Sequence, residues 1–170
     1  VTVPHRYNLA NFSGGVPYSA VRLSGDSAHD ELYVIDGNSV HVFNSTGMEI
    51  FAFGNDTDLG NLRDLAVDED GDLFILSDER PLGGGEPEMF ILRCNSRGAP
   101  KVRLALTHVP AEFSGFSPSR LFYHDGKLVL VSTRQMWAVV ADRGGSVEKT
   151  YDLGQLAGIV ESQRPDTEIF

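Results

Sequence analysis

The chain has 170 residues, of which 41% are hydrophobic and 22% are charged, a composition typical of one globular domain with a sizeable core. Its formal net charge of -10 argues against a nucleic-acid partner, because binding phosphates requires a clustered basic surface. No apolar stretch approaches the roughly 18 residues that a membrane-spanning helix needs, so we expect no membrane span.

The first unit of the chain reads as four short strands. A strand is expected at 19–24, SAVRLS, and three more within residues 31–54, ELYVIDGNSVHVFNSTGMEIFAFG. Polar and apolar residues alternate in these strands, and the breaks fall at DGN and NSTG. Asn, Asp and Gly suit tight turns because they tolerate left-handed backbone conformations.

This order of strands and turns recurs twice. The second unit predicts strands at 63–68, 72–77, 88–94 and 100–106, and the third at 119–124, 127–132, 135–140 and 147–153. The turn before each last strand begins at Asn44, Asn95 or Asp142, a period of about 50 residues. Four antiparallel strands at such a period are typical of β-propeller blades.

We therefore predict an all-β fold, a partial β-propeller in one domain over residues 1–170. Three whole blades are expected at about 17–54, 61–106 and 117–153. The segments 4–9 and 167–170 resemble strands of a preceding and a following blade, so a strand is expected to flank the blades at each end. Three blades form an open arc, because known propellers close with about four to eight. Either the remaining blades of a larger chain or a second copy would close the ring.

The first unit resembles an NHL repeat. It has a leading Pro17, the run LYVIDGNSVHVFNSTG and a closing FAFG. The second unit keeps LAVDEDGDLFILSD but inserts ERPLGGGEPE, and the third keeps HDGKLVLVS and Trp137 but lacks the closing Phe-Gly. The resemblance covers about residues 17–153 and implies a propeller of the six-bladed type. Such propellers mostly serve as binding platforms, and some relatives are hydrolases or lyases.

Motifs for catalysis or cofactor binding are incomplete in this sequence. DEDGD at 68–72 is similar to the start of a calcium loop, but a strand follows where the loop should continue, so a hairpin turn is favoured. The five histidines show no metal-ligand spacing, and Cys94 lies in the apolar strand MFILRC, where we expect it to be buried and inert. No cofactor or catalytic residue is assigned.

Topology predicts a binding site better than motifs do. In a four-stranded meander, the loop between the second and third strands lies on the same face as the link to the next blade. Polar residues at these places should converge on one rim around the central channel, where concave sites commonly bind ligands. The rim residues are Tyr18, Asp36, Asn38, Arg63, Asp64, Asp78, Arg80, Arg120 and Arg134.

Two functions remain open from the sequence. The first is a non-catalytic platform that binds a protein, peptide or glycan through this rim. In that case we expect Arg63, Asp64 and Arg134 to contribute to binding and to contribute little to folding stability. The alternative is a metal-dependent hydrolase, a lactonase, or a lyase of the six-bladed type, for which Asp36, Asp64 and Asp78 are the candidate ligands. Because the chain starts at Val1 and not at Met, we expect that a leader or N-terminal portion was removed, and we expect an extracytoplasmic location, periplasmic or secreted.

Overall fold

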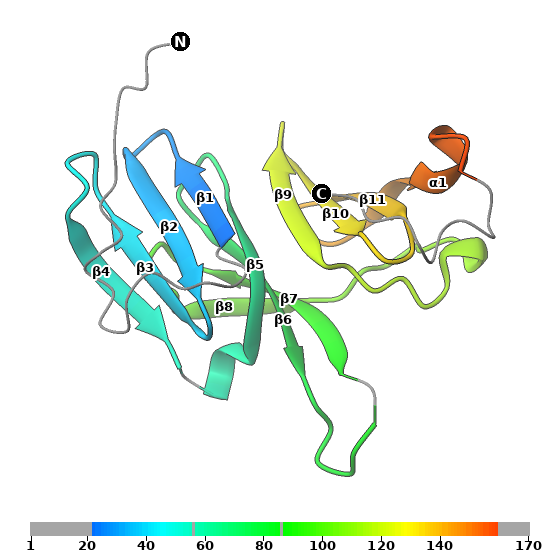
Figure 1. Ribbon diagram of the computed structural model, residues 1–170, viewed down its shortest axis with the longest axis horizontal. Helices are drawn as coiled ribbons and strands as arrows, with labels where there is room; N and C mark the ends of the chain where they lie inside the picture. Colours follow the sequence, from blue (N-terminus) through cyan, green and yellow to red (C-terminus); the bar gives the residue numbers. More distant parts are fainter. Residues whose placement is uncertain (1–21, 56, 86, 160–170) are drawn as a thin grey trace.

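The computed structural model describes residues 22–55, 57–85 and 87–159, and within them the chain folds into three four-stranded antiparallel sheets (Figure 1). In each sheet the strands lie side by side in chain order. The strands are β1 Arg22–Asp26, β2 Glu31–Asp36, β3 Ser39–Phe43, β4 Glu49–Gly54, β5 Asn61–Val67, β6 Leu73–Glu79, β7 Glu88–Cys94, β8 Pro100–Leu104, β9 Arg120–His124, β10 Lys127–Ser132, β11 Trp137–Asp142 and β12 Val147–Asp152. Short helical segments lie between the sheets along the chain at η2 Thr57–Leu59 and η3 Ala111–Phe113, and after β12 at α1 Leu153–Leu156.

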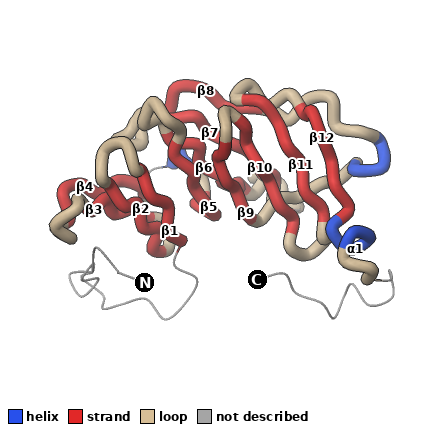
Figure 2. Tube along the Cα trace, turned by 90° about the horizontal axis from the view of Figure 1, so that it is seen from above, coloured by secondary structure: helices blue, strands red, loops and turns tan. Residues whose placement is uncertain are grey.

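The three sheets pack face to face, with their first strands next to one another. β5 contacts both β1 and β9, and Figure 2 shows these strands on the inner side of the arc. Each sheet then runs outward to β4, β8 or β12. This all-β arrangement is consistent with three blades of a partial propeller, as the sequence predicts.

Two hydrophobic cores fill the spaces between neighbouring sheets. The first core joins the first and second sheets and includes the fully buried Tyr33, Val42 and Ile75. The second joins the second and third sheets and includes Phe74 and Leu130, also fully buried. Side chains alternate across a strand, so Phe74 and Ile75 of β6 enter opposite cores. The second sheet is therefore the layer on which the other two pack.

Some strands begin and end where the sequence predicts, and others differ by a few residues. The bounds of β2, β3, β7 and β10 are those expected. β1 continues to Asp26, where a turn was expected, because Asp26 still pairs with Glu31. β11 starts at Trp137 and not at Gln135, because Thr133–Met136 forms the turn. The expected strand at 4–9, the one at 167–170 and the leading Pro17 lie outside the described residues.

Four hairpin turns at one end of the sheets share a single hydrogen-bond pattern. In the turn at Asn95, the side-chain Oδ1 accepts from the backbone N–H groups of Arg97 and Ala99, each at 3.0 Å. The fourth residue, Gly98, has φ +80°, which glycine adopts without steric cost. The turns at Asn44, Asp68 and Asp142 repeat these bonds and this glycine. The predicted turns are confirmed, and DEDGD forms one of them.

At this turn end, charged residues link one sheet to the next. Arg143 of the third sheet pairs with Asp68 and Asp70 of the second, the latter at 2.9 Å. Arg97 of the second sheet lies 3.4 Å from Glu31 of the first, and its guanidinium lies 5.3 Å from the centre of the Phe51 ring. The arginines of these turns therefore meet acidic partners within the protein.

Cys94 lies in the first core and is completely buried. Burial, with a smaller contribution from the charge of Asp72, raises the pKa of its thiol to about 12. The thiolate is the reactive form of cysteine, so we expect Cys94 to resist a thiol reagent in the folded protein and to react fully in denaturant. Fast reaction under native conditions would show that the first core is open.

Candidate binding site at the channel mouth

Three arginines lie near the starts of the three inner strands. Arg22 is the first residue of β1, Arg120 is the first residue of β9, and Arg63 is the third residue of β5. Because these strands occupy equivalent positions in adjacent sheets, their starts fall at the same end of the arc. A cavity of about 510 Å³ opens there, and we call it the channel mouth. Its lining comprises Arg22, Ile35, Gly37, Leu62, Arg63, Asp78, Pro87, Met89, Ser117, Pro118, Ser119 and Arg120.

The channel mouth is cationic although the protein as a whole is acidic. Among the described residues, three arginines and one carboxylate, that of Asp78, line it, and the Asp64 carboxylate lies in an adjacent cavity that Arg22 and Arg120 also line. Asp78 is only 2% exposed, and it accepts hydrogen bonds from Arg63 Nε and, at 2.9 Å, from Asn61 Nδ2. Its charge is thus compensated inside the protein, while the Arg63 side chain remains 53% exposed. The ion pair thus orients an arginine side chain of which about half stays exposed.

Asp64 has a different place from the one the sequence suggested. It lies in a smaller cavity of about 290 Å³ between β1, β5 and β9, and it is 6% exposed. Its carboxylate accepts from the backbone N–H of Leu121 at 2.8 Å and of Leu65 at 3.0 Å. Burial raises the pKa of Asp64, and these two bonds and the charges of Arg120 and Arg22 oppose the rise. Asp64 therefore joins the second and third sheets, and from these hydrogen bonds we expect it to contribute to folding, contrary to the expectation from the sequence.

Four further expected rim residues that the structure describes, Asp36, Asn38, Arg80 and Arg134, are not in the lining of the mouth. Asn38 joins two sheets, because its Oδ1 accepts from the backbone N–H of Leu62 at 2.8 Å. Asp36, half-buried, ends β2 beside the mouth. Arg80 and Arg134 are exposed, after β6 and in the β10–β11 turn respectively, and neither lines the cavity. Tyr18 lies outside the described residues.

Sequence reasoning missed Arg22 and the apolar edge formed by Met89 and Pro118. Arg22 lies within the strand expected at 19–24, of which residues 19–21 are outside the described residues, and sequence reasoning assigned it no role at the rim. Aligning the units on their strands would have found it, because Arg22 pairs with Ile35 and Arg120 with Val131, each the fifth residue of the second strand of its sheet. Met89 had no comparable signal, because an alternating strand pattern does not say which core residues reach a cavity.

The carboxylates proposed as metal ligands do not meet. Asp64 and Asp78 line separate cavities, and both accept hydrogen bonds from the protein. Within the described ranges, no three His, Cys, Asp or Glu side chains are grouped so that they could hold a metal ion. In the same part of the chain, no helix has the length and apolar character needed to cross a membrane.

Comparison with known proteins gives no functional assignment. No protein-family model matches the chain, and no curated protein matches it. The chain is similar to a solved structure, a protein of unknown function from Bacteroides caccae determined at 1.35 Å resolution, with a TM-score of 0.48 and 11% sequence identity. The match covers 78% of this chain and 45% of the other, so the chain spans less than half of that protein's length. A similarity this distant identifies neither a family nor an activity.

Proposed function

We propose that the chain is a non-catalytic binding platform of the NHL-like propeller type, which binds a protein, peptide or glycan ligand at the channel mouth. One observation carries the proposal: a cavity of about 510 Å³ receives residues from all three sheets, and its described lining has three arginines and one carboxylate, that of Asp78, which Arg63 already pairs. With Asp64 counted from the adjacent cavity, the arginines still outnumber the carboxylates. Cavities of roughly 300–1,000 Å³ with a few convergent polar groups are the usual form of a ligand site.

The way Arg63 is held supports binding in preference to a purely structural role. Its Nε donates to the buried Asp78, yet half of its side chain is exposed. A guanidinium oriented in this way loses less conformational entropy when a ligand arrives, which favours affinity. Arg120 is oriented in a similar manner, because its Nη1 donates to the Ser119 carbonyl at 3.0 Å.

The proposal includes partners for the outermost sheets. Large apolar side chains are exposed on the first and third sheets: Leu23 at 60%, Phe122 at 53% and Tyr151 at 39%. The remaining blades of a propeller, or a second copy of the chain, would cover such faces, as neighbouring blades do for each other in this arc. An extracytoplasmic location, periplasmic or secreted, is also part of the proposal.

Removing two charges from the mouth should weaken ligand binding without unfolding the protein. We expect the double variant Arg63→Ala/Arg120→Ala to lose at least about tenfold in affinity for a ligand found by screening the protein on peptide and glycan arrays, because each lost charge-assisted hydrogen bond is worth about 1.5–3 kcal/mol. The affinity is measured by titration calorimetry, and a thermal melt of each protein checks its folding.

The matched control is Lys149→Ala, which removes an exposed cation from β12, far along the sheet from the inner strands. This variant should bind like the original chain. If Lys149→Ala weakens binding as much as the double variant does, general charge attraction explains the interaction and the mouth is not the site. Unchanged binding by the double variant would place the site elsewhere.

A further inference from the structure

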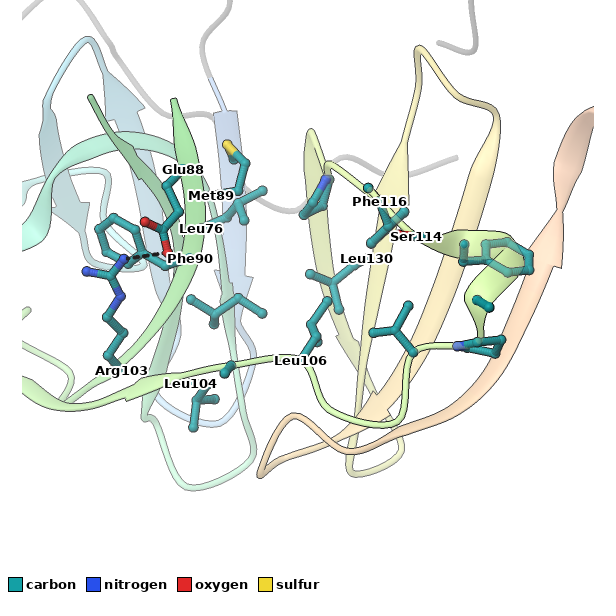
Figure 3. Close-up of a pocket in the computed structure, with 18 residues that line it drawn as sticks. Leu76, Glu88, Met89, Phe90, Arg103, Leu104, Leu106, Ser114, Phe116 and Leu130 are labelled. Atoms are coloured by element: carbon teal, nitrogen blue, oxygen red, sulfur yellow. Dashed lines mark ion pairs between the residues drawn. The ribbon is translucent and has the colours of Figure 1, made fainter. Parts of the chain in front are cut away.

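A second hollow adjoins the channel mouth. A cavity of about 700 Å³ lies between the second and third sheets, and we call it the interblade groove. Met89 and Pro118 line both the groove and the mouth, so the two cavities meet at these residues. Figure 3 shows the groove, with Leu76 and Met89 of the second sheet facing Phe116 and Leu130 across it.

The groove is suited to an apolar group. Its walls include Ile91 from β7, Leu106 and Phe116 from the β8–β9 connection, and Leu130 from β10. A hydrophobic side chain that enters such a cavity removes its own surface and that of the walls from water. Against these apolar side chains the hydroxyl groups of a glycan would lack hydrogen-bond partners, and the polar side chains of the lining are those of Glu88, Arg103 and Ser114.

The charges at the groove are already satisfied. Arg103 places its guanidinium 3.9 Å from the centre of the Phe90 ring, and it pairs with Glu79 at 2.9 Å and with Glu88 at 3.6 Å. Figure 3 marks the pair with Glu88. The groove therefore has apolar walls with one arginine between two glutamates at its edge, whereas the described lining of the adjoining mouth has three arginines and one paired carboxylate.

We propose that the ligand is a peptide segment that carries an acidic residue close to a large apolar residue. The carboxylate lies among the arginines of the mouth, the chain crosses Met89 and Pro118, and the apolar side chain fills the groove. The inference rests on the proposed function, and it selects a peptide from the three ligand classes named there. Its basis is that a cavity with three arginines adjoins one with apolar walls, Met89 and Pro118 lining both.

The three methionines of the chain supply a direct readout. Met89 lies where the cavities meet, Met48 is 59% exposed near the turn end, and Met136 is 1% exposed within the protein. Protein with ¹³C-labelled methionine methyl groups is titrated with short blocked peptides, in which one aspartate is separated from one leucine by zero, one, two or three glycines. At least one peptide should shift the Met89 methyl resonance and leave that of Met48 in place.

Two substitutions in the peptide and one in the protein test which cavity holds each part of the ligand. Leucine to serine in the best peptide should weaken binding by about tenfold or more, because burying a leucine side chain is worth about 1.5–3 kcal/mol. Aspartate to asparagine should weaken it by a similar factor, and this second loss should disappear in Arg120→Ala. The variant Ser114→Trp, which adds a large side chain at an exposed position of the groove lining, should abolish the leucine dependence alone.

The outcomes separate this inference from the proposed function. An array ligand such as a glycan could require Arg63 and Arg120 for binding and yet not shift the Met89 methyl resonance. That result would contradict the peptide inference and would still support the binding platform. Equal binding of the leucine and serine peptides would also overturn it. If none of the peptides binds at millimolar concentration, the peptide inference is wrong. The array screen still tests separately whether the protein binds a ligand at the mouth.

Discussion

Replacing Phe74 with alanine is expected to lower the free energy of unfolding by about 3–5 kcal/mol, the usual cost of truncating a fully buried aromatic side chain. Phe74 has no exposed surface and lies in the second core. Its ring stacks on Tyr123 of the third sheet, with centroids 5.9 Å apart, and the Arg93 guanidinium lies 5.9 Å from its centre. The truncation thus removes contacts that join two sheets. Equilibrium unfolding in urea measures the loss.

Phe122 provides the matched control, because it is a phenylalanine next to Tyr123 on β9 but 53% exposed. In the monomeric chain, where no partner covers it, Phe122→Ala should change the free energy of unfolding by only about 0.5 kcal/mol, as surface substitutions usually do. Equal losses for the two variants would mean that the second and third sheets do not pack through Phe74.

The second large effect concerns Asp64. Asp64→Ala leaves the backbone N–H groups of Leu65 and Leu121 without their carboxylate acceptor. Each unsatisfied buried donor costs about 1–3 kcal/mol, so the variant should be destabilised by at least that amount. Asp64→Asn should also destabilise, because an amide has one oxygen for two N–H donors that approach different oxygens of the carboxylate. Urea unfolding of both variants tests this expectation.

Asp36→Ala is the control for Asp64, since Asp36 is a half-buried aspartate beside the mouth. Its free energy of unfolding should stay close to that of the original chain. If Asp64→Ala lowers the free energy of unfolding no more than Asp36→Ala does, Asp64 contributes little to folding and this expectation is wrong.

The fold was largely predictable because local chemistry repeats along the chain. Asn44, Asn95 and Asp142 each begin a turn whose glycine comes three residues later, and these short-range hydrogen bonds depend on adjacent residues alone. The strands between these turns alternate polar and apolar residues, and this pattern and the turns together fix the register in which neighbouring strands pair. Turn chemistry and the period of about 50 residues were therefore sufficient to indicate blades.

The roles within the candidate site were less predictable, because they depend on contacts between sheets. Asp64 and Asp78 both looked like rim carboxylates, yet Asp64 accepts from a backbone N–H that lies 57 positions along the chain. Asp78 is paired by Arg63, 15 positions earlier. Neither partner follows from the local pattern. The meeting of the mouth and the groove at Met89 depends in the same way on how two sheets pack.

The most direct test of the binding platform follows the arginine side chains themselves. With ¹⁵N-labelled arginine, addition of an array-selected ligand should shift the Nε–H resonances of Arg22, Arg63 and Arg120 at the channel mouth. Those of Arg97 and Arg143, which pair with acidic residues at the turn end, should stay in place. Shifts confined to Arg97 and Arg143 at saturating ligand, with the three mouth arginines unchanged, would contradict the account.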